Sequence, residues 1–309
     1  MSQPAASPAP IFKALLDRVA ADRRVSDAET LDLRRAVFAD GDVDRAEAGA
    51  LFDIAGRVAN EDAAWAEAFV EAVGDHVLGP DRHITDDRAG WLIMHAPLAG
   101  ALAAPLLVSA LDRAESAPAA LAAAARAAVL KAVADAPLDA RAVAWVRTCL
   151  HAVAGDGAAH IGAEEAQWLF DLDAAVDGRP NDPAWSDLFV KAILNHVMGQ
   201  RPSALLGRES RLARRAWLEA PVRPAPVGFL ARAFAGGLDG WRARIAEPGE
   251  VDAFEAAYAE RLAHAAEDAV LTLDEVTRLV ALARADGKRT ANEARLLEEV
   301  RRLEAAQAG

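Results

Sequence analysis

Four acidic residues crowd the short stretch FADGDVDRAE at residues 38–47, and carboxylates at this spacing are candidates for binding a divalent cation. They are Asp40, Asp42, Asp44 and Glu47. The three aspartates match the first, third and fifth positions of a calcium loop. However, Arg45 takes the place of the glycine at the sixth position, and Leu51 the place of the bidentate glutamate at the twelfth. The stretch is therefore not an EF-hand, and we keep it as a weak site for a cation such as calcium.

The same acids also have a structural interpretation, as caps of the helix that follows them. Asp44 and Glu47 have the spacing of a capping box, in which each side chain accepts a hydrogen bond from the other residue's backbone amide. The pattern recurs as Ser26 with Glu29, as Thr272 with Glu275, and as Thr290 with Glu293. We therefore expect each motif to be a short joint between two helices, with cation binding as the alternative at the first joint.

The other side chains that could do chemistry give less specific signals. His76 and His196 stand in DHVLG and NHVMG near expected helix ends, where an imidazole interacts favourably with terminal carbonyls. Cys149 lies two residues from His151, so on a helix the two side chains diverge, and we expect a buried structural thiol. One loose group could take a metal, although its spacing matches no defined site: Asp156, His160, Glu164 and Glu165. No phosphate loop, zinc helix or nucleophile elbow is present.

Long internal similarities indicate which elements carry these motifs. Residues 60–79, NEDAAWAEAFVEAVGDHVLG, match residues 181–199, NDPAWSDLFVKAILNHVMG. Trp65 and Phe69 correspond to Trp185 and Phe189, and their four-residue spacing predicts packing between helices. A third, shorter copy near residues 266–300 aligns with residues 20–54. The chain therefore reads as two full units and a half unit.

The fold class predicted from this pattern is all-α, with tandem repeats of a multi-helix bundle. Alanine, leucine, glutamate and arginine dominate, and apolar residues such as Leu33, Ala36 and Val37 recur at helical spacing. We expect a disordered segment at residues 1–10, repeat units at 11–115 and 116–245, and a C-terminal half unit at 246–309.

The joints resemble those of the TerB-like family of tellurite-resistance-associated helical domains. The resemblance covers roughly residues 13–80, 128–200 and 255–305, and lies mostly in ADGDVDRAE, GDGAAHIGAEE and ADGKRTANE. It implies a non-catalytic helical fold associated with stress responses or envelope-linked protein assemblies, with acidic residues proposed to bind metal in some members. The acidic positions carried over are Asp40 and Glu47, Asp156 and Glu165, and Asp286 and Glu293.

Composition argues against several other classes of function. The formal net charge of −13 argues against a nucleic-acid-binding surface, although arginines cluster at residues 208–215 and 241–245. The N-terminus has no signal-peptide pattern, and the most apolar run, LAGALAAPLLVSAL, is short and contains Pro105, which we expect to break it. We therefore expect no membrane span and a cytoplasmic location, which the single cysteine also favours.

These observations favour a non-enzymatic scaffold or interaction protein with a protein partner and a possible homo-oligomeric state. The alternative is an enzyme or a small-ligand or metal-binding protein whose site lies between repeat units. His76 beside Asp75 would belong to such a site if both side chains faced a deep pocket.

Overall fold

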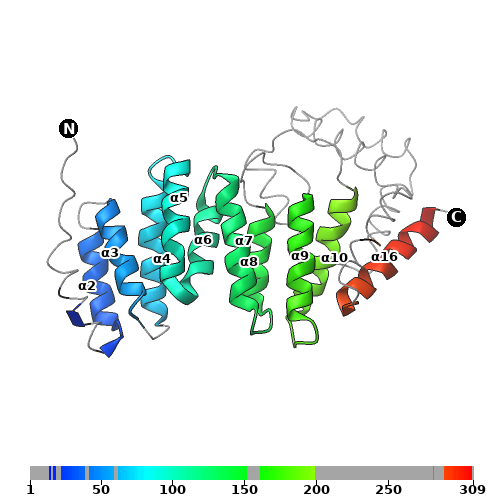
Figure 1. Cartoon of the computed structure of the whole chain (residues 1–309), viewed down its shortest axis with the longest axis horizontal. Helices are drawn as coiled ribbons and strands as arrows, with labels where there is room; N and C mark the ends of the chain where they lie inside the picture. Colours follow the sequence, from blue (N-terminus) through cyan, green and yellow to red (C-terminus); the bar gives the residue numbers. More distant parts are fainter. Residues whose placement is uncertain are drawn as a thin grey trace, which may run out of the picture. The chain divides into compact units, whose positions relative to one another are not determined.

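The computed structural model describes residues 22–38, 42–58, 62–151, 161–198 and 289–307, together with the isolated positions 14, 17, 18 and 281. Across these residues the chain is helical and forms no strand, which confirms the predicted all-α class (Figure 1). The helices are α2 (Asp27–Val37), α3 (Arg45–Ala55), α4 (Ala63–Leu78), α5 (Asp86–His95), η1 (Ala96–Leu102), α6 (Ala103–Arg113), α7 (Ala119–Val133), α8 (Ala140–His151), α9 (Ala163–Val176), α10 (Pro183–Met198) and α16 (Ala291–Gln307).

The described helices fall into two compact units. The first unit holds α2 to α7 and nearly all of α8, and the second holds α9, α10 and α16 with the connecting residues 137–140. The predicted repeat boundaries at residues 115 and 245 concern sequence similarity and stay predictions.

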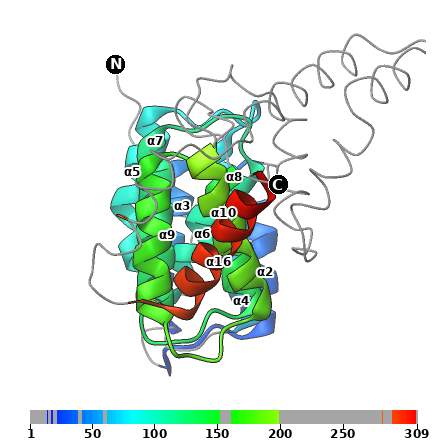
Figure 2. The same ribbon diagram turned by 90° about the vertical axis from the view of Figure 1, so that its right-hand side faces the viewer.

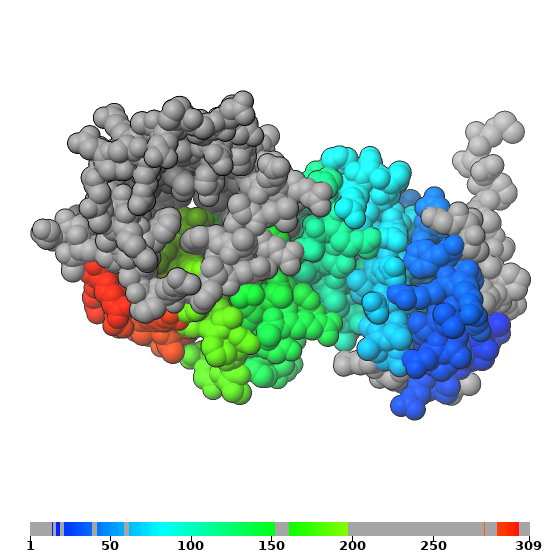
Figure 3. Space-filling view, turned by 180° about the vertical axis from the view of Figure 1, so that it is seen from behind, coloured from blue at the N-terminus to red at the C-terminus, as the bar shows by residue number. Residues whose placement is uncertain are grey.

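In the first unit, successive helices run up and down beside one another, and the core lies between α4 and its neighbours (Figure 1). Helix α4 packs against α2, α3, α5 and α6, and α6 packs in turn against α7. Phe52 of α3 lies at the centre, edge-on to Phe69 at 5.3 Å and to Trp91 at 5.6 Å between ring centroids. On the face seen in Figure 3, the blue and cyan residues of α2 to α5 lie next to one another.

The second unit repeats part of this packing with its own residues. Helix α10 packs against α9, and the rings of Phe170 and Phe189 meet edge-on at 5.4 Å. Helices α4 and α10 both have 16 residues, and Trp65 and Trp185 are each 1% exposed. The prediction that these tryptophans pack between helices is confirmed. On its other side α10 contacts α16, which crosses it obliquely (Figure 2).

Side chains at the helix starts explain why the elements begin where they do. The residues that accept hydrogen bonds from first-turn amides are Ser26 before α2, Asp44 before α3, Asp62 before α4 and Thr85 before α5. Such caps satisfy backbone amides that have no partner within the helix. Helix α4 ends at Gly79, where φ is 65° and ψ is −177°. This region of backbone space is open essentially only to glycine, so the residue type itself stops the helix.

A single stretch of the described chain, Asp86–Arg113, is long and apolar enough to cross a membrane by length and composition. The structure divides it into α5, η1 and α6, with Gly100 in a non-helical conformation at φ 56° and ψ −121°. The expectation that Pro105 breaks this run is wrong. Pro105 lies in the first turn of α6, where a missing amide removes no intrahelical hydrogen bond, and the break lies at Gly100. The stretch is thus no clear membrane span.

Candidate functional site

The first joint uses its acids as local hydrogen-bond acceptors. Asp44 Oδ1 accepts from the amides of Ala46 at 2.7 Å and Glu47 at 2.8 Å, and Glu47 Oε2 accepts from the Asp44 amide at 3.0 Å. This is the predicted capping box. Asp42 Oδ1 accepts from the Val43 amide at 3.0 Å. Asp40, the fourth candidate ligand, lies outside the described residues. A cation at this joint would therefore bind carboxylates that already accept hydrogen bonds from backbone amides. Cation binding here stays a prediction.

A histidine ties this joint to the neighbouring helix. The Nδ1 atom of His76 lies 2.8 Å from the carbonyl oxygen of Val43, the residue just before the cap of α3. The His76 ring also meets the Trp91 ring edge-on at 5.0 Å. The sequence predicted that His76 interacts with carbonyls at the end of its own helix, but its partner lies 33 residues away. His76 therefore fixes the position of α4 against the start of α3.

The second unit contains the same arrangement. Nδ1 of His196 lies 2.7 Å from the carbonyl oxygen of Ile161, which again is the residue before the helix cap, here Gly162. The Gly162 amide donates to Glu165 Oε2 at 2.9 Å, so the glutamate half of the capping box is kept although glycine has no side chain to complete it. Both Val43 and Ile161 are buried. The two histidines thus serve equivalent joints.

The acid-and-histidine group expected at the second joint is only partly described. Glu164 is exposed and Glu165 caps α9, whereas Asp156 and His160 lie outside the described residues. At the third joint Glu293 Oε2 accepts from the Thr290 amide at 3.0 Å and completes a capping box, and Asp286 lies outside the described part of the chain. Among the described residues, no three histidine, cysteine or acidic side chains converge to hold a metal.

Among the described residues, one unusual ionisable group lies outside the sequence motifs. Asp173 on α9 is 2% exposed and accepts hydrogen bonds from three side chains. The donors are Trp185 Nε1 at 2.9 Å, Thr290 Oγ1 at 2.5 Å and Asn292 Nδ2 at 2.6 Å. Burial raises the pKa of the Asp173 carboxyl above its ordinary value of 3.8, although all three hydrogen bonds act in the opposite direction.

One sequence signal could have found Asp173. The apolar stripe of α9 runs through Leu169, Leu172 and Val176, at the positions i, i+3 and i+7. Asp173 occupies the i+4 position of the same stripe, where a lone carboxylate needs a hydrogen-bonding partner. The stripe shows that the acid is buried, but the identity of its partners depends on residues more than a hundred positions away.

Several other reactive groups of the described chain are held in structural contacts. Cys149 is buried, as expected for a structural thiol. Asp75 forms an ion pair with Arg113, so the acid beside His76 faces a cation. His83 Nδ1 lies 2.7 Å from Ser116 Oγ. The backbones of the same two residues form an isolated parallel β-bridge between two connecting segments. The arginine clusters near residues 208–215 and 241–245 lie outside the described residues.

Comparisons with protein-family models, with curated proteins and with solved structures found no match to this chain. The resemblance of the joints to TerB-like domains therefore remains an expectation drawn from the motifs themselves.

Proposed function

We propose that this chain is a non-enzymatic interaction or scaffold protein built from repeated, TerB-like helical units. The observation that carries the proposal is the pair of equivalent joints. His76 bonds the carbonyl of Val43 and His196 that of Ile161. In both joints the amide of the following residue donates to a capping glutamate. Equivalent contacts at equivalent positions support a duplicated structural unit, and repeated helical units commonly present extended surfaces to partners.

The use of polar groups in these units supports a non-catalytic role. Many enzymes place a general acid, base or nucleophile beside the substrate position. In the described joints Asp44, Glu47 and Glu165 cap helices, while His76 and His196 hold backbone carbonyls. We propose a protein partner, in a stress-related or envelope-linked assembly as the resemblance implies. We also propose that a divalent cation binds weakly at Asp42 and Asp44 in the first joint.

A pull-down from native cytoplasm tests this function, with the purified full chain as bait and parallel samples in calcium and in chelator. A specific protein partner kept in both samples supports a constitutive scaffold. A partner lost only in chelator assigns the first joint a cation, and Asp42→Asn should then abolish capture. Retention of no specific protein in either sample contradicts the scaffold role and leaves the ligand-binding alternative.

Charged residues substituted at exposed apolar positions can show which surface binds the partner. Leu31, Met94 and Leu98 are large apolar side chains of the first unit with 49%, 70% and 50% exposure. Met94→Glu and Leu98→Glu leave the described core intact, because neither side chain is buried. Asp53→Lys, at an exposed position of α3, is the matched control for a change of surface charge. Capture that falls with the apolar variants alone locates the partner on the first unit.

A further inference from the structure

We propose that the face of α9 and α10 around Asp173 is a helix-binding site, and that α16 of the same chain is its resident ligand. The inference rests on the interaction role proposed above and deepens it, because it names one binding surface and what that surface recognises. Three kinds of contact carry it, from the first turn of α16 to its middle.

The first contact is the recognition of the start of α16 by a buried carboxylate. Thr290, the residue before α16, donates to Asp173 Oδ2, and Asn292 in the first turn donates to Asp173 Oδ1. Trp185 of α10 donates to the same Oδ1 atom. Because an unpaired buried carboxylate is strongly unfavourable, this acid requires partners of defined position. Docking of α16 in another register would leave Asp173 without two of its donors.

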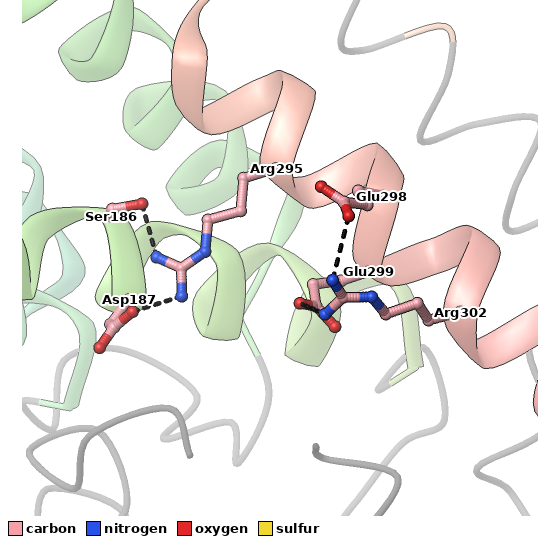
Figure 4. A network of polar contacts seen from close by, with 6 residues as sticks. All are labelled: Ser186, Asp187, Arg295, Glu298, Glu299 and Arg302. Carbon is pink, nitrogen blue, oxygen red and sulfur yellow. Dashed lines mark hydrogen bonds and ion pairs between the residues drawn. The ribbon is translucent and has the colours of Figure 1, made fainter. Parts of the chain in front are cut away.

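The second contact is an ion pair one turn further along. Arg295 Nη1 donates to Ser186 Oγ at 2.7 Å, and Arg295 Nη2 lies 2.6 Å from Asp187 Oδ1, so one guanidinium reaches two adjacent residues of α10 (Figure 4). A planar guanidinium with two fixed donors adds directional specificity to a contact. Glu298 and Glu299 bind Arg302 within α16 itself, so these two ion pairs support the helix (Figure 4).

The third contact is apolar and small. Leu296 and Val300 lie four residues apart on one face of α16 and are 0% and 3% exposed. Two anchors at i and i+4 are typical of an amphipathic helix that lies in a groove. Ala294, Glu298 and Arg301 on other faces are exposed. Helix α16 is therefore recognised by two anchors and two polar contacts along a single face.

The first unit lacks two of the groups that bind α16. Alignment of LFDI at residues 51–54 with LFDL at 169–172 places Ala55 opposite Asp173. Alignment of Trp65 with Trp185 places Ala66 opposite Ser186. The buried acid and the hydroxyl thus belong only to the unit that contacts α16. This difference between otherwise similar helix pairs indicates a site adapted to its ligand.

The smaller number of buried apolar side chains in α16 than in α10 predicts that α16 can leave this site while the rest of the unit stays folded. The buried apolar side chains of α10 include Trp185, Leu188, Phe189 and Ile193, whereas those of residues 291–302, the part of α16 whose side chains are described, are Leu296 and Val300. Segments with few buried apolar contacts open locally at lower free energy than the core around them. Release of α16 would expose Asp173, Ser186 and Asp187 to another helix.

Hydrogen exchange of the full-length protein, followed by mass spectrometry of peptides from α2, α10 and α16, tests this inference. In the wild type, amides of α16 should exchange faster than those of α10. Asn292→Ala removes one hydrogen bond to Asp173 and should accelerate exchange in α16 about ten- to a hundredfold, since hydrogen bonds to charged groups have effects of this size. Alanine is also a better helix former than asparagine, so helix propensity alone would slow exchange.

The controls separate docking from general destabilisation. Asp171→Ala removes an exposed carboxylate from the same helix as Asp173 and should leave α16 unchanged. Arg295→Ala should reproduce the effect of Asn292→Ala, while peptides of α2 keep their wild-type rates in every variant. Equal exchange of α16 and α10 in the wild type, or an Asn292→Ala variant with unchanged or slower exchange in α16, overturns the inference. Neither result depends on the pull-down, so the proposed scaffold role is judged separately.

Discussion

At His76 a single hydrogen bond joins α4 to the joint that precedes α3. Its partner is a backbone carbonyl, and His196 makes the equivalent bond to Ile161. A ring of similar size without nitrogen would keep the packing against Trp91 and lose only the bond. The contribution of this bond to stability can therefore be measured directly.

We expect His76→Phe and His196→Phe each to lower the free energy of unfolding by about 1 kcal/mol, the usual net contribution of a hydrogen bond. Urea denaturation followed by tryptophan fluorescence measures the effect. His83→Phe is the control, because His83 is exposed and contacts the Ser116 hydroxyl. Equal losses in all three variants would show that the effect is not specific to the joints.

At Asp173 the raised pKa predicts a distinctive dependence of stability on pH. The folded protein holds the carboxyl proton to a higher pH than the unfolded chain, whose pKa is near 3.8. Stability from this group therefore falls as the pH rises from about 3.8 to the folded pKa, and is constant above it. Asp173→Asn removes this dependence. Its stability relative to the wild type should rise through that window and then level off.

Denaturant midpoints of both proteins from pH 3.5 to 7 test this prediction. The difference between the two curves is the informative quantity, because all other carboxylates are shared. Asp171→Asn on the same helix shows the general effect of removing one negative charge. A difference between wild type and Asp173→Asn that does not change with pH would contradict a raised pKa in the folded state.

Among the elements, the start of α3 distinguishes the two interpretations of the acidic stretch. Asp44 bonds two amides of the first turn, whereas Asp42 bonds only the amide that follows it. As a cap, Asp44→Ala should lower the unfolding free energy by about 1 kcal/mol in calcium and in chelator alike, and Asp42→Ala by clearly less. Thermal unfolding provides the measurement. If calcium stabilises the wild type, and both variants lose this stabilisation equally, the acids bind a cation.

The end of α4 depends on the conformation that only Gly79 readily adopts. A side chain there would be strained by the positive φ, and its Cβ atom would collide with the guanidinium of Arg88. We expect Gly79→Ala to reduce stability by about 1–3 kcal/mol. Gly90→Ala is the matched control, since Gly90 lies within α5 with open space around its Cα atom, and it should add about 0.5–1 kcal/mol. Denaturation of both variants in parallel compares the two glycines, and a stable Gly79→Ala variant would contradict the assigned role.

For the whole molecule, the net charge of −13 governs its encounters with other polymers. A surface of this sign repels phosphate backbones and releases no counterions on contact with them. We therefore expect no salt-dependent binding of duplex DNA by the full chain in fluorescence anisotropy between 50 and roughly 200 mM salt. An affinity that falls steeply with salt would show that the arginines near residues 208–215 form a basic surface.

Much of this protein follows from local rules that a sequence displays. Helical periodicity predicts the all-α class, and the pairs Ser26 with Glu29 and Asp44 with Glu47 predict helix starts that the structure confirms. Caps act within four residues, so their partners can be read directly from the sequence. The burial of Trp65 and Trp185 follows equally from size and spacing.

Tertiary structure alone decided which distant groups meet. His76 bonds the carbonyl of Val43, 33 residues away in the sequence, and Asp173 accepts a hydrogen bond from Thr290, 117 residues away. Periodicity places a polar residue on the buried face of a helix, but the residue's partner depends on which other helix covers that face. In this protein α16 covers the face of Asp173, and the need of a buried carboxylate for hydrogen-bond donors determines how the helix is held there.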